Sequence, residues 1–548
     1  MLLEHWEEQS LKVNLKYMKN IIFTLLAFLI YHNLCATDYY VNANTGNDSY
    51  NGLSISTAFK TINRAAYITL PGDNVFVMNG TYMSEQPEWS IVNITRSGAP
   101  SNWITYTNYP GHSPLLFFTG SGISIYNQAS YININGFTIK GNIDNLNLAS
   151  ALNQPGSCND PTGTINPLYN GNGITMWAEP NIEQIHHINI TNNTIFNCPA
   201  GAIYGSRCDY ITIENNMMYN NAWYTLYGSS GIALYQNSNY DNSMGYRMTI
   251  KNNRLMGNYN LVPWLVNCGI YDGNGIIIDD SKHTQNGSTV PAYTGRTLIA
   301  NNIIYGSGGP GVHVYESEHV DIINNSVYYN QQTDVNFNGE IDANNSNDIL
   351  IRNNIMYSKS DKPINTVVNS TNIVVDNNLY YGGNGTSVNG TNAINQNPEF
   401  LNPSLSLSAD FYLSSSSPAI DAGSSTLAPS TDINGNPRPS GGGFDIGAYE
   451  FGSALNIESN KLNKNVISIY PNPVEKTLFI NFNSNISEDE VFIEIFDTTG
   501  RKIMTSTSNK NSNNIIPLNI ETLNLKTGIY FLKVGCNTIN DLKILVKK

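Results

Sequence analysis

The segment I-T-N-N at residues 190–193 decides the fold, because six further segments repeat its pattern. An apolar β-branched residue comes first, a variable residue follows, and two asparagines end each segment. The shortest distance between successive pairs is 23 residues, which suits one coil of a parallel β-helix whose paired asparagines stack as a hydrogen-bonded ladder. The other segments are I-E-N-N at 213–216, I-K-N-N at 250–253, I-A-N-N at 299–302, I-I-N-N at 322–325, I-R-N-N at 351–354 and V-D-N-N at 375–378.

The spacing between these pairs shows where the chain departs from a plain coil. Successive gaps are 23, 37, 49, 23, 29 and 24 residues. A coil that stacks on its neighbours cannot lengthen, so the excess must leave as loops, which solenoids often place on their binding face. A third excursion, Asp144 to Asn170, comes earlier. We therefore expect the functional surface beside these insertions.

The amino-acid composition limits which kinds of molecule the protein can bind. Only 13% of residues are charged and the net charge is −14, which argues against nucleic acid because phosphate binding needs a basic face. An acidic polysaccharide stays compatible, since a local basic cluster or a bound cation can override the global charge.

The N-terminal region predicts export. Residues 1–17 read as an extension upstream of the natural start, and Met18 to Ala36 as a secretory signal peptide with Lys19 ahead of an apolar core. No later segment is apolar enough to span a bilayer. We expect a monomer that is secreted or attached to the cell surface.

Cysteine spacing matches no zinc pattern. Five of the six cysteines follow the signal peptide, so at least one is unpaired. Export permits disulfides, and Cys158 with Cys268 is the predicted pair because both lie in long insertions; buried free thiols are the alternative.

The expected class is all-β: a right-handed parallel β-helix with an N-terminal helical cap, followed by a small β-sandwich. The predicted β-helix spans 37–400, its closing segment 401–452, a linker 453–465 and the sandwich 466–548. Phe59 to Ile68 is the predicted amphipathic cap, hiding edge strands at the open end.

Five glycine-led strands can be laid over one another, because strand residues alternate inward and outward. The first position after each glycine is apolar and should face the core. The second and fourth should face outward, and the strand ends at the fifth. The predicted outer face then carries Trp177, Tyr204, Tyr235, His313 and Tyr315 beside Asp279, Asp280, Glu316 and Arg207.

Tyr271 to Lys282, Y-D-G-N-G-I-I-I-D-D-S-K, lies at the centre of this face. Three carboxylates and an ammonium within so short a stretch are unusual in a charge-poor chain. Aromatic rings can stack on sugars, and carboxylates can hold hydroxyls, protons or metals. The predicted function is that of a secreted carbohydrate-active enzyme.

Two stretches resemble known families. Y-Y-V-N-A-N-T-G-N-D-S-Y-N-G from Tyr39, with S-G-A-P-S-N-W-I-T-Y-T-N-Y-P-G at Ser97–Gly111, resembles the start of pectate-lyase-like β-helix proteins, including family-nine pectate lyases and the chondroitinase B and alginate lyase group. From Val466, I-S-I-Y-P-N-P and L-K-T-G-I-Y-F-L-K-V resemble the C-terminal sorting domain of the type IX secretion system. The second resemblance implies the secretion machinery as a partner.

The first resemblance favours a polysaccharide lyase that cleaves a uronic acid polymer by β-elimination. It implies calcium as the neutraliser of the substrate carboxylate, with Asp272, Asp279, Asp280 and Glu316 as oxygen ligands. Lys282 or Arg207 would be the base. The compact acidic calcium motif of family nine is not recognisable in this chain.

Two other functions stay open. Stacked carboxylates would suit a glycoside hydrolase, and Asp279–Asp280 followed by Gly311–Val312–His313 faintly resembles polygalacturonases. A non-catalytic, carbohydrate-binding or adhesive solenoid is the third function, and it would bind without forming a product.

A separate calcium loop is predicted at Asp334–Asp342, D-V-N-F-N-G-E-I-D, with Asp334, Asn336 and Asn338 as ligands. The alternative is an ordinary turn between coils.

Overall fold

The computed structural model describes residues 36–178, 184–334, 338–452, 467–482, 490–497, 502–509, 515–523, 525–536 and 539–548. The chain divides into two compact units, Met1–Ser453 and Ala454–Lys548. The predicted upstream extension, nearly all of the signal peptide and the linker lie outside the described residues. In the described part, no helix has the length and apolar character needed to cross a membrane.

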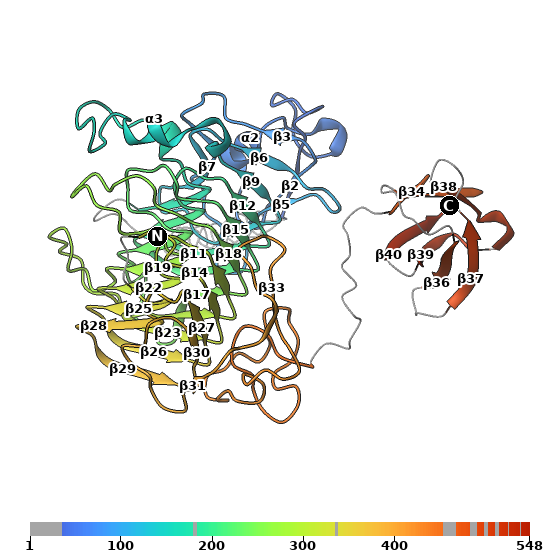
Figure 1. Ribbon diagram of the computed structural model, residues 1–548. Helices are drawn as coiled ribbons and strands as arrows, with labels where there is room; N and C mark the ends of the chain where they lie inside the picture. The colour runs from blue at the N-terminus through green and yellow to red at the C-terminus, as the bar shows by residue number, and fades with distance from the viewer. Residues whose placement is uncertain are drawn as a thin grey trace, which may run out of the picture. The chain divides into compact units, whose positions relative to one another are not determined.

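The first unit is a right-handed parallel β-helix built from three long sheets, here named A, B and C (Figure 1). Each complete coil contributes one strand to each sheet, sheets A and B extend beyond sheet C at the ends of the stack, and neighbouring strands pair in parallel. Sheet A contains β1 (Asp38–Val41), β2 (Asn74–Val77), β5 (Ile104–Asn108), β8 (Ile132–Asn135), β11 (Ile185–Thr191), β14 (Cys208–Glu214), β17 (Tyr246–Lys251), β20 (Arg296–Ala300), β23 (Glu318–Ile323), β26 (Asn347–Arg352) and β29 (Thr371–Asp376).

Sheets B and C complete each coil. Sheet B contains β3 (Thr81–Tyr82), β6 (Leu115–Phe117), β9 (Thr138–Lys140), β12 (Thr194–Phe196), β15 (Met217–Tyr219), β18 (Arg254–Met256), β21 (Ile303–Tyr305), β24 (Ser326–Tyr328), β27 (Ile355–Ser358), β30 (Leu379–Gly382) and β31 (Ile394–Asn395). Sheet C contains β4 (Ser90–Ile94), β7 (Ser121–Ile125), β10 (Ile174–Trp177), β13 (Ile203–Ser206), β16 (Ile232–Tyr235), β19 (Ile276–Asp279), β22 (Val312–Tyr315), β25 (Ile341–Asn344) and β28 (Asn365–Val368).

The second asparagine of each I-x-N-N pair forms the predicted ladder at the turn between sheets A and B. The Nδ2 of Asn216 donates to Oδ1 of Asn253 at 3.0 Å and to the carbonyl of Ile190 at 2.8 Å. Its own Oδ1 accepts from the backbone N–H and Nδ2 of Asn193. The same bonds run from coil to coil through Asn302, Asn325, Asn354 and Asn378. Each buried amide is satisfied only if the next coil is in register.

The first asparagine of each pair forms the turn between the sheets. Asn192, Asn215 and Asn252 have φ of 56°, 58° and 57°, the left-handed region that turns the chain between sheets. Asparagine tolerates this region better than most residues with a Cβ. The N-N dipeptide therefore combines a turn residue with a ladder residue.

The long insertions on one side of sheet C pack together. They carry helices η2 (Ile143–Asn145), α3 (Leu148–Leu152) and η3 (Pro167–Tyr169) and share a small core that includes Ile143, Ala151, Leu226 and Val262. The predicted disulfide between Cys158 and Cys268 joins two of these insertions. Cys198 and Cys208 are buried free thiols.

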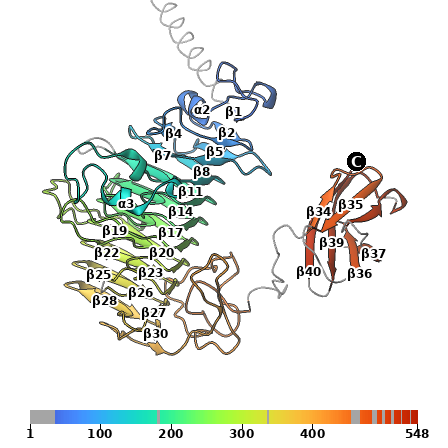
Figure 2. The same cartoon turned by 45° about the horizontal axis from the view of Figure 1, so that its top comes forward.

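The helical cap is present as α2 (Ile62–Ile68), preceded by the short η1 (Ile55–Thr57). Thr61 caps α2 by accepting from the N–H of Arg64, and Ile62, Ala65 and Ala66 are buried. The helix lies at the N-terminal end of the stack beside β1 and β2 (Figure 2), so it covers edge strands as predicted.

The segment from Phe400 to Glu450 packs on the outer face of sheet B. It contains β32 (Phe400–Asn402) and β33 (Asp410–Leu413), and Phe411 and Tyr449 join a core with Tyr305 and Tyr328. The buried pair of Arg438 Nη1 and Glu450 Oε2, 2.6 Å apart, lies within it.

The second unit is a small antiparallel β-sandwich, as predicted. One sheet contains β34 (Ile467–Tyr470), β35 (Thr477–Phe482) and β38 (Ile515–Asn519). The other contains β36 (Glu490–Phe496), β37 (Lys502–Asn509), β39 (Gly528–Cys536) and β40 (Ile539–Lys547), and η4 (Glu521–Leu523) follows β38. Ile480, Ile493 and Leu532 are among its buried core residues.

The ladder predicts unequal costs for neighbouring asparagines. Asn216→Ala should lower the free energy of unfolding of the β-helix by about 3 kcal/mol, because it leaves several buried donors and acceptors unpaired. Asn215→Gly, one residue earlier, should change it by less than about 0.5 kcal/mol, because glycine accepts a left-handed φ. Urea denaturation of both variants measures the difference. Equal losses of unfolding free energy in the two variants would contradict the separate roles of the first and second asparagines.

A buried glutamate gives the fold a pH dependence. Glu340 is fully buried, and Asn330 donates to it from the backbone N–H and from Nδ2. Burial raises the pKa of Glu340 to about 8. The folded state therefore favours the neutral acid, and stability should fall as pH rises from the ordinary carboxyl pKa through about 8.

Glu340→Gln should remove this dependence and raise the stability by roughly 2–3 kcal/mol at pH 7, measured by denaturation between pH 4 and pH 8. Glu318→Gln, at a partly exposed glutamate of sheet A, is the matched control for the loss of one carboxyl group. An unaltered slope in Glu340→Gln would contradict the assignment.

Candidate functional site

The outer face of sheet C has the predicted register. Tyr204 pairs with Thr175 and Ala233, and His313 pairs with Ile277. In the other outward column, Asp279 lies between Tyr235 and Tyr315. The inward-facing residues Ile232, Ile276 and Val312 are fully buried. The face continues for two further coils, with Asp342 and Asn344 of β25 and with Thr366 and Val368 of β28.

Asp342 is the functional candidate that sequence reasoning missed. The Nδ1 of His313 lies 2.8 Å from Oδ2 of Asp342, as an ion pair without the alignment of a hydrogen bond. The hydroxyl of Thr366, in the next coil, donates to the other oxygen of Asp342. The glycine-led alignment failed here because Glu340 stands between Gly339 and the strand. The repeated outward position was the signal that could have found it.

The carboxylates around His313 favour its protonated form. Burial acts to lower its pKa, but Asp342, together with Asp272 and Asp279, outweighs burial and raises it. The His313 imidazole stands in a column that otherwise holds neutral side chains and Asp342. A basic group therefore lies in the middle of an acidic face.

Asp279 is partly exposed and lies beside the imidazole of His313. Desolvation is the main cause that raises its pKa to about 7, and repulsion by Asp272 adds to it. Gln285 opposes the shift by donating from Nε2 to Oδ1 of Asp279 at 2.9 Å. A carboxyl with this pKa can both give and take a proton near neutral pH.

Asp272 precedes β19 and takes part in the same electrostatic group. Its Oδ1 accepts from Nδ2 of Asn274 at 3.1 Å. Its Oδ2 packs against the Cα of Gly228, where any Cβ would collide with the carboxylate. Burial raises the pKa of Asp272, whereas the charge of His313 lowers it.

Asp280 does not reach the outer face, so the expectation that it lies there is wrong. It is fully buried, with φ of 49°, and accepts from Gln236 Nε2 at 2.8 Å. It also accepts from the backbone N–H groups of Thr284 and Gln285. Asp280 follows the last residue of β19 and has a left-handed backbone conformation. Its side chain therefore points into the turn.

The remaining charged candidates lie at the same corner. The Nζ of Lys282 donates to the backbone carbonyl of Asn345 at 2.9 Å. Arg207 donates from Nη2 to Gln236, and Glu316 accepts from the hydroxyl of Thr284. These groups are engaged in turn contacts, and Arg207 and Glu316 have the left-handed φ that Asp280 has.

The aromatic candidates lie on the face. Trp177 is 39% exposed, and its ring centroid is 6.2 Å from that of Tyr204. Tyr315 stacks on His313 at 5.7 Å, and Tyr235 accepts at its hydroxyl from Asn286. Rings and acid–base groups therefore share one surface.

The predicted calcium ligands lie at two places, on the outer face of sheet C and in the loop at Asp334–Asp342. Among the described residues, no group of three or more histidine, cysteine or acidic side chains lies close enough to hold a metal ion. The predicted loop ligand Asn336 lies outside the described residues, while Asp334 and Asn338 lie inside them. Asp342, from the same motif, belongs to strand β25. Calcium stays a prediction.

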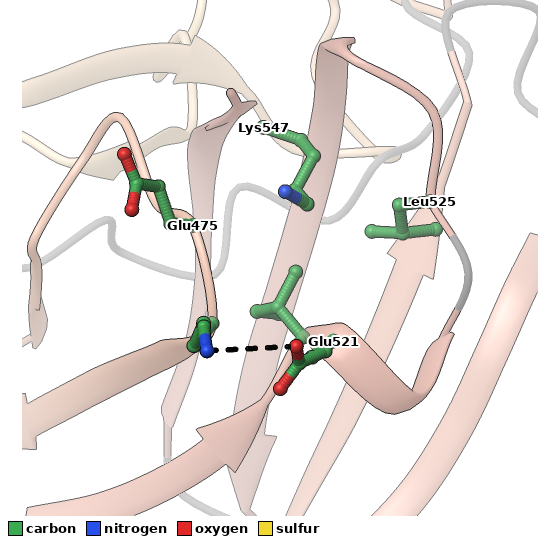
Figure 3. A pocket seen from close by; sticks show the side chains of 6 residues that line it. Glu475, Glu521, Leu525 and Lys547 are labelled. Atoms are coloured by element: carbon green, nitrogen blue, oxygen red, sulfur yellow. Dashed lines mark ion pairs between the residues drawn. The ribbon is translucent and has the colours of Figure 1, made fainter.

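A pocket in the C-terminal unit is separate from this face (Figure 3). Lys476 and Glu521 form an ion pair across it, with Nζ and Oε1 3.8 Å apart and both side chains exposed. Exposed pairs of this kind contribute little free energy. The pocket is lined by Glu475, Lys476, Ile520, Glu521, Leu525 and Lys547.

Comparison with known proteins identifies the second unit. Residues 468–548 match the family model described as "Secretion system C-terminal sorting domain". These residues are a secretion sorting domain. The prediction of a type IX signal is thereby confirmed, and the protein is secreted or attached to the cell surface.

For the β-helix, no curated protein sequence matches significantly. Solved structures with similar folds include pectate lyase Pel9A, 15% identical, covering 76% of this chain and 97% of that chain, with a TM-score of 0.42. XylC in complex with xylose is 12% identical, covering 76% and 98%, with a TM-score of 0.38. A rhamnogalacturonan lyase is 13% identical, covering 67% and 91%, with a TM-score of 0.35.

The position of Asp280 yields a test that needs no substrate. Asp280→Ala should release the loop at residues 281–290, because it removes the acceptor for two backbone N–H groups and for Gln236. We expect at least about tenfold faster cleavage of this loop by a nonspecific protease, since local opening follows the lost hydrogen bonds. Asp279→Asn, at the partly exposed neighbour, keeps a side-chain oxygen that can accept from Gln285 and should leave the cleavage rate unchanged. Equal protection in both variants would contradict the anchoring role.

Proposed function

We propose that this protein is an extracellular polysaccharide-cleaving enzyme whose substrate lies along the outer face of sheet C. The observation that carries the proposal is the placement of Asp279, whose pKa is about 7, beside the His313–Asp342 ion pair. The exposed ring of Trp177, together with Tyr204 and Tyr235, offers surfaces on which sugar rings can stack. Secretion by the sorting domain places the enzyme where polysaccharides are found.

The favoured reaction is β-elimination in a uronic acid polymer. The positive charge of His313, maintained by Asp342, would neutralise the uronate carboxylate and make the C5 proton more acidic. Asp279 would take that proton, the C4–O bond would break, and a C4=C5 double bond would form while the leaving oxygen gains a proton. We assign the base to Asp279 in place of Lys282 or Arg207, because the side chains of the last two donate hydrogen bonds at the turn after the strand.

Hydrolysis is the second candidate, favoured by the coupling of Asp272 with Asp279. Two carboxyl groups that repel each other titrate apart, so one can remain an acid while the other is a carboxylate. Asp279 would then protonate the glycosidic oxygen, and Asp272 would act as nucleophile or base.

The dependence of rate on pH separates the two reactions. If Asp279 is the base of an elimination, kcat/KM should rise with pH through about 7 and fall again when His313 loses its proton. If Asp279 is the acid of a hydrolysis, kcat/KM should fall through the same range. Initial rates on pectate, alginate and chondroitin sulfate between pH 4 and pH 10 provide the measurement.

The product distinguishes them independently. Elimination should create an unsaturated uronide that absorbs near about 235 nm, whereas hydrolysis gives reducing ends without that absorbance. Binding to these polymers with neither product would indicate a carbohydrate-binding solenoid and sink the enzymatic proposal.

Variants test the residues. Asp279→Asn and His313→Ala should each lower kcat by roughly 10²–10⁴-fold, because each removes a group that exchanges or balances charge in the transition state. Asp144→Asn is the control, since it removes an exposed carboxylate that is paired with Lys140 of sheet B and is not one of the outward residues of sheet C. Normal rates in Asp279→Asn would contradict the site assignment.

A further inference from the structure

One loop, residues 281–290, carries polar side chains onto the face at two points. The Nε2 of Gln285 donates to Asp279, and the Nδ2 of Asn286 donates to the hydroxyl of Tyr235 at 2.8 Å. Both contacted residues are outward members of the same column, on β19 and β16. The amides therefore stand at one edge of the surface where a glycan would lie.

The root of this loop is fixed in the interior. Asp280 accepts from the backbone N–H groups of Thr284 and Gln285, at 2.6 and 3.1 Å. His283 is buried, with Nε2 2.7 Å from the carbonyl of Asn237 and Nδ1 3.1 Å from the hydroxyl of Ser288. A loop anchored by fully buried groups holds its tip in place, so Gln285 and Asn286 are preorganised.

The carbonyl oxygens of these two amides remain available. Neither Oε1 of Gln285 nor Oδ1 of Asn286 has a hydrogen-bond partner among the described residues, while one donor of each is used on the face. An amide with one fixed donor and an open acceptor matches a sugar hydroxyl, which both donates and accepts. Two adjacent amides match a pair of neighbouring hydroxyls on one pyranose ring.

We propose that Gln285 and Asn286 form a hydroxyl-recognising subsite that binds a sugar residue of the polysaccharide beside Tyr235. The inference rests on the proposed function and extends it to a segment that the catalytic groups do not include. The chemical class of the ligand is a pyranose with vicinal hydroxyls, recognised by its hydroxyls and by stacking on the Tyr235 ring. Asp280 is the positioning residue that fixes where the two amides stand.

Binding measurements in a slow variant test this subsite apart from turnover. Oligosaccharides of pectate, alginate and chondroitin sulfate are titrated calorimetrically into the full chain carrying Asp279→Asn, so that the probe is not consumed. Against the probe that binds, adding Asn286→Ala or Gln285→Ala should each weaken the affinity about 3- to 10-fold, the effect of losing one or two hydrogen bonds. Thr289→Ala, at an exposed position of the same loop, is the matched control and should leave the affinity unchanged.

Each outcome decides the matter. Unchanged affinity in both amide variants overturns the subsite while leaving the proposed function intact. Tighter binding also overturns it, because the loop would then obstruct the face. Failure of every probe to bind the Asp279→Asn chain overturns the proposed function, and the subsite falls with it. Circular dichroism of the variants verifies that the β-helix is folded.

Discussion

The structure of the first unit depends on one repeated interaction, the stacking of buried asparagine amides between coils. Each rung exchanges hydrogen bonds with the next, as Asn302 does with Asn325 and Asn325 with Asn354. A buried amide that loses its partner costs more than the bond contributes, so the ladder penalises any slip in register. The register of the sheets, and with it the order of residues on every outward face, follows from this constraint.

Because the ladder fixes the register of the three sheets, loops of different length can be inserted between strands without altering the β-helix. Two consecutive coils carry the long insertions, yet the ladder continues without interruption through Asn216, Asn253 and Asn302. The inserted residues form structure of their own, closed by the Cys158–Cys268 disulfide on one side of sheet C and anchored by Asp280 on the other. Rigid loops beside a rigid sheet are what a preorganised binding surface requires.

Burial and neighbouring charges shift the pKa values of the acidic and basic groups on this face by different amounts. Asp342 raises the pKa of His313 against the opposing effect of burial, and the charge of His313 acts against the rise in the pKa values of Asp272 and Asp279. The pKa of Asp279 is nevertheless about 7. Carboxyl groups whose pKa values are shifted towards neutral pH are frequent at functional sites.

The sequence by itself determined the solenoid, the coil length, the outward columns, the cap, the disulfide and the sorting domain, because each rests on local periodicity or on a short motif. The sandwich and the register of β10 to β22 followed in the same way. Only the tertiary structure decided which acids are available. Asp279 and Asp280 are neighbours in the chain, yet one φ of 49° turns Asp280 into the corner while Asp279 stays on the sheet. The partnership of His313 with Asp342 joins two coils 29 residues apart, and the contact of Gln285 with Asp279 depends on how a loop folds back. Periodicity specifies positions on a strand, but it carries no information about turns that bury one residue and expose the next.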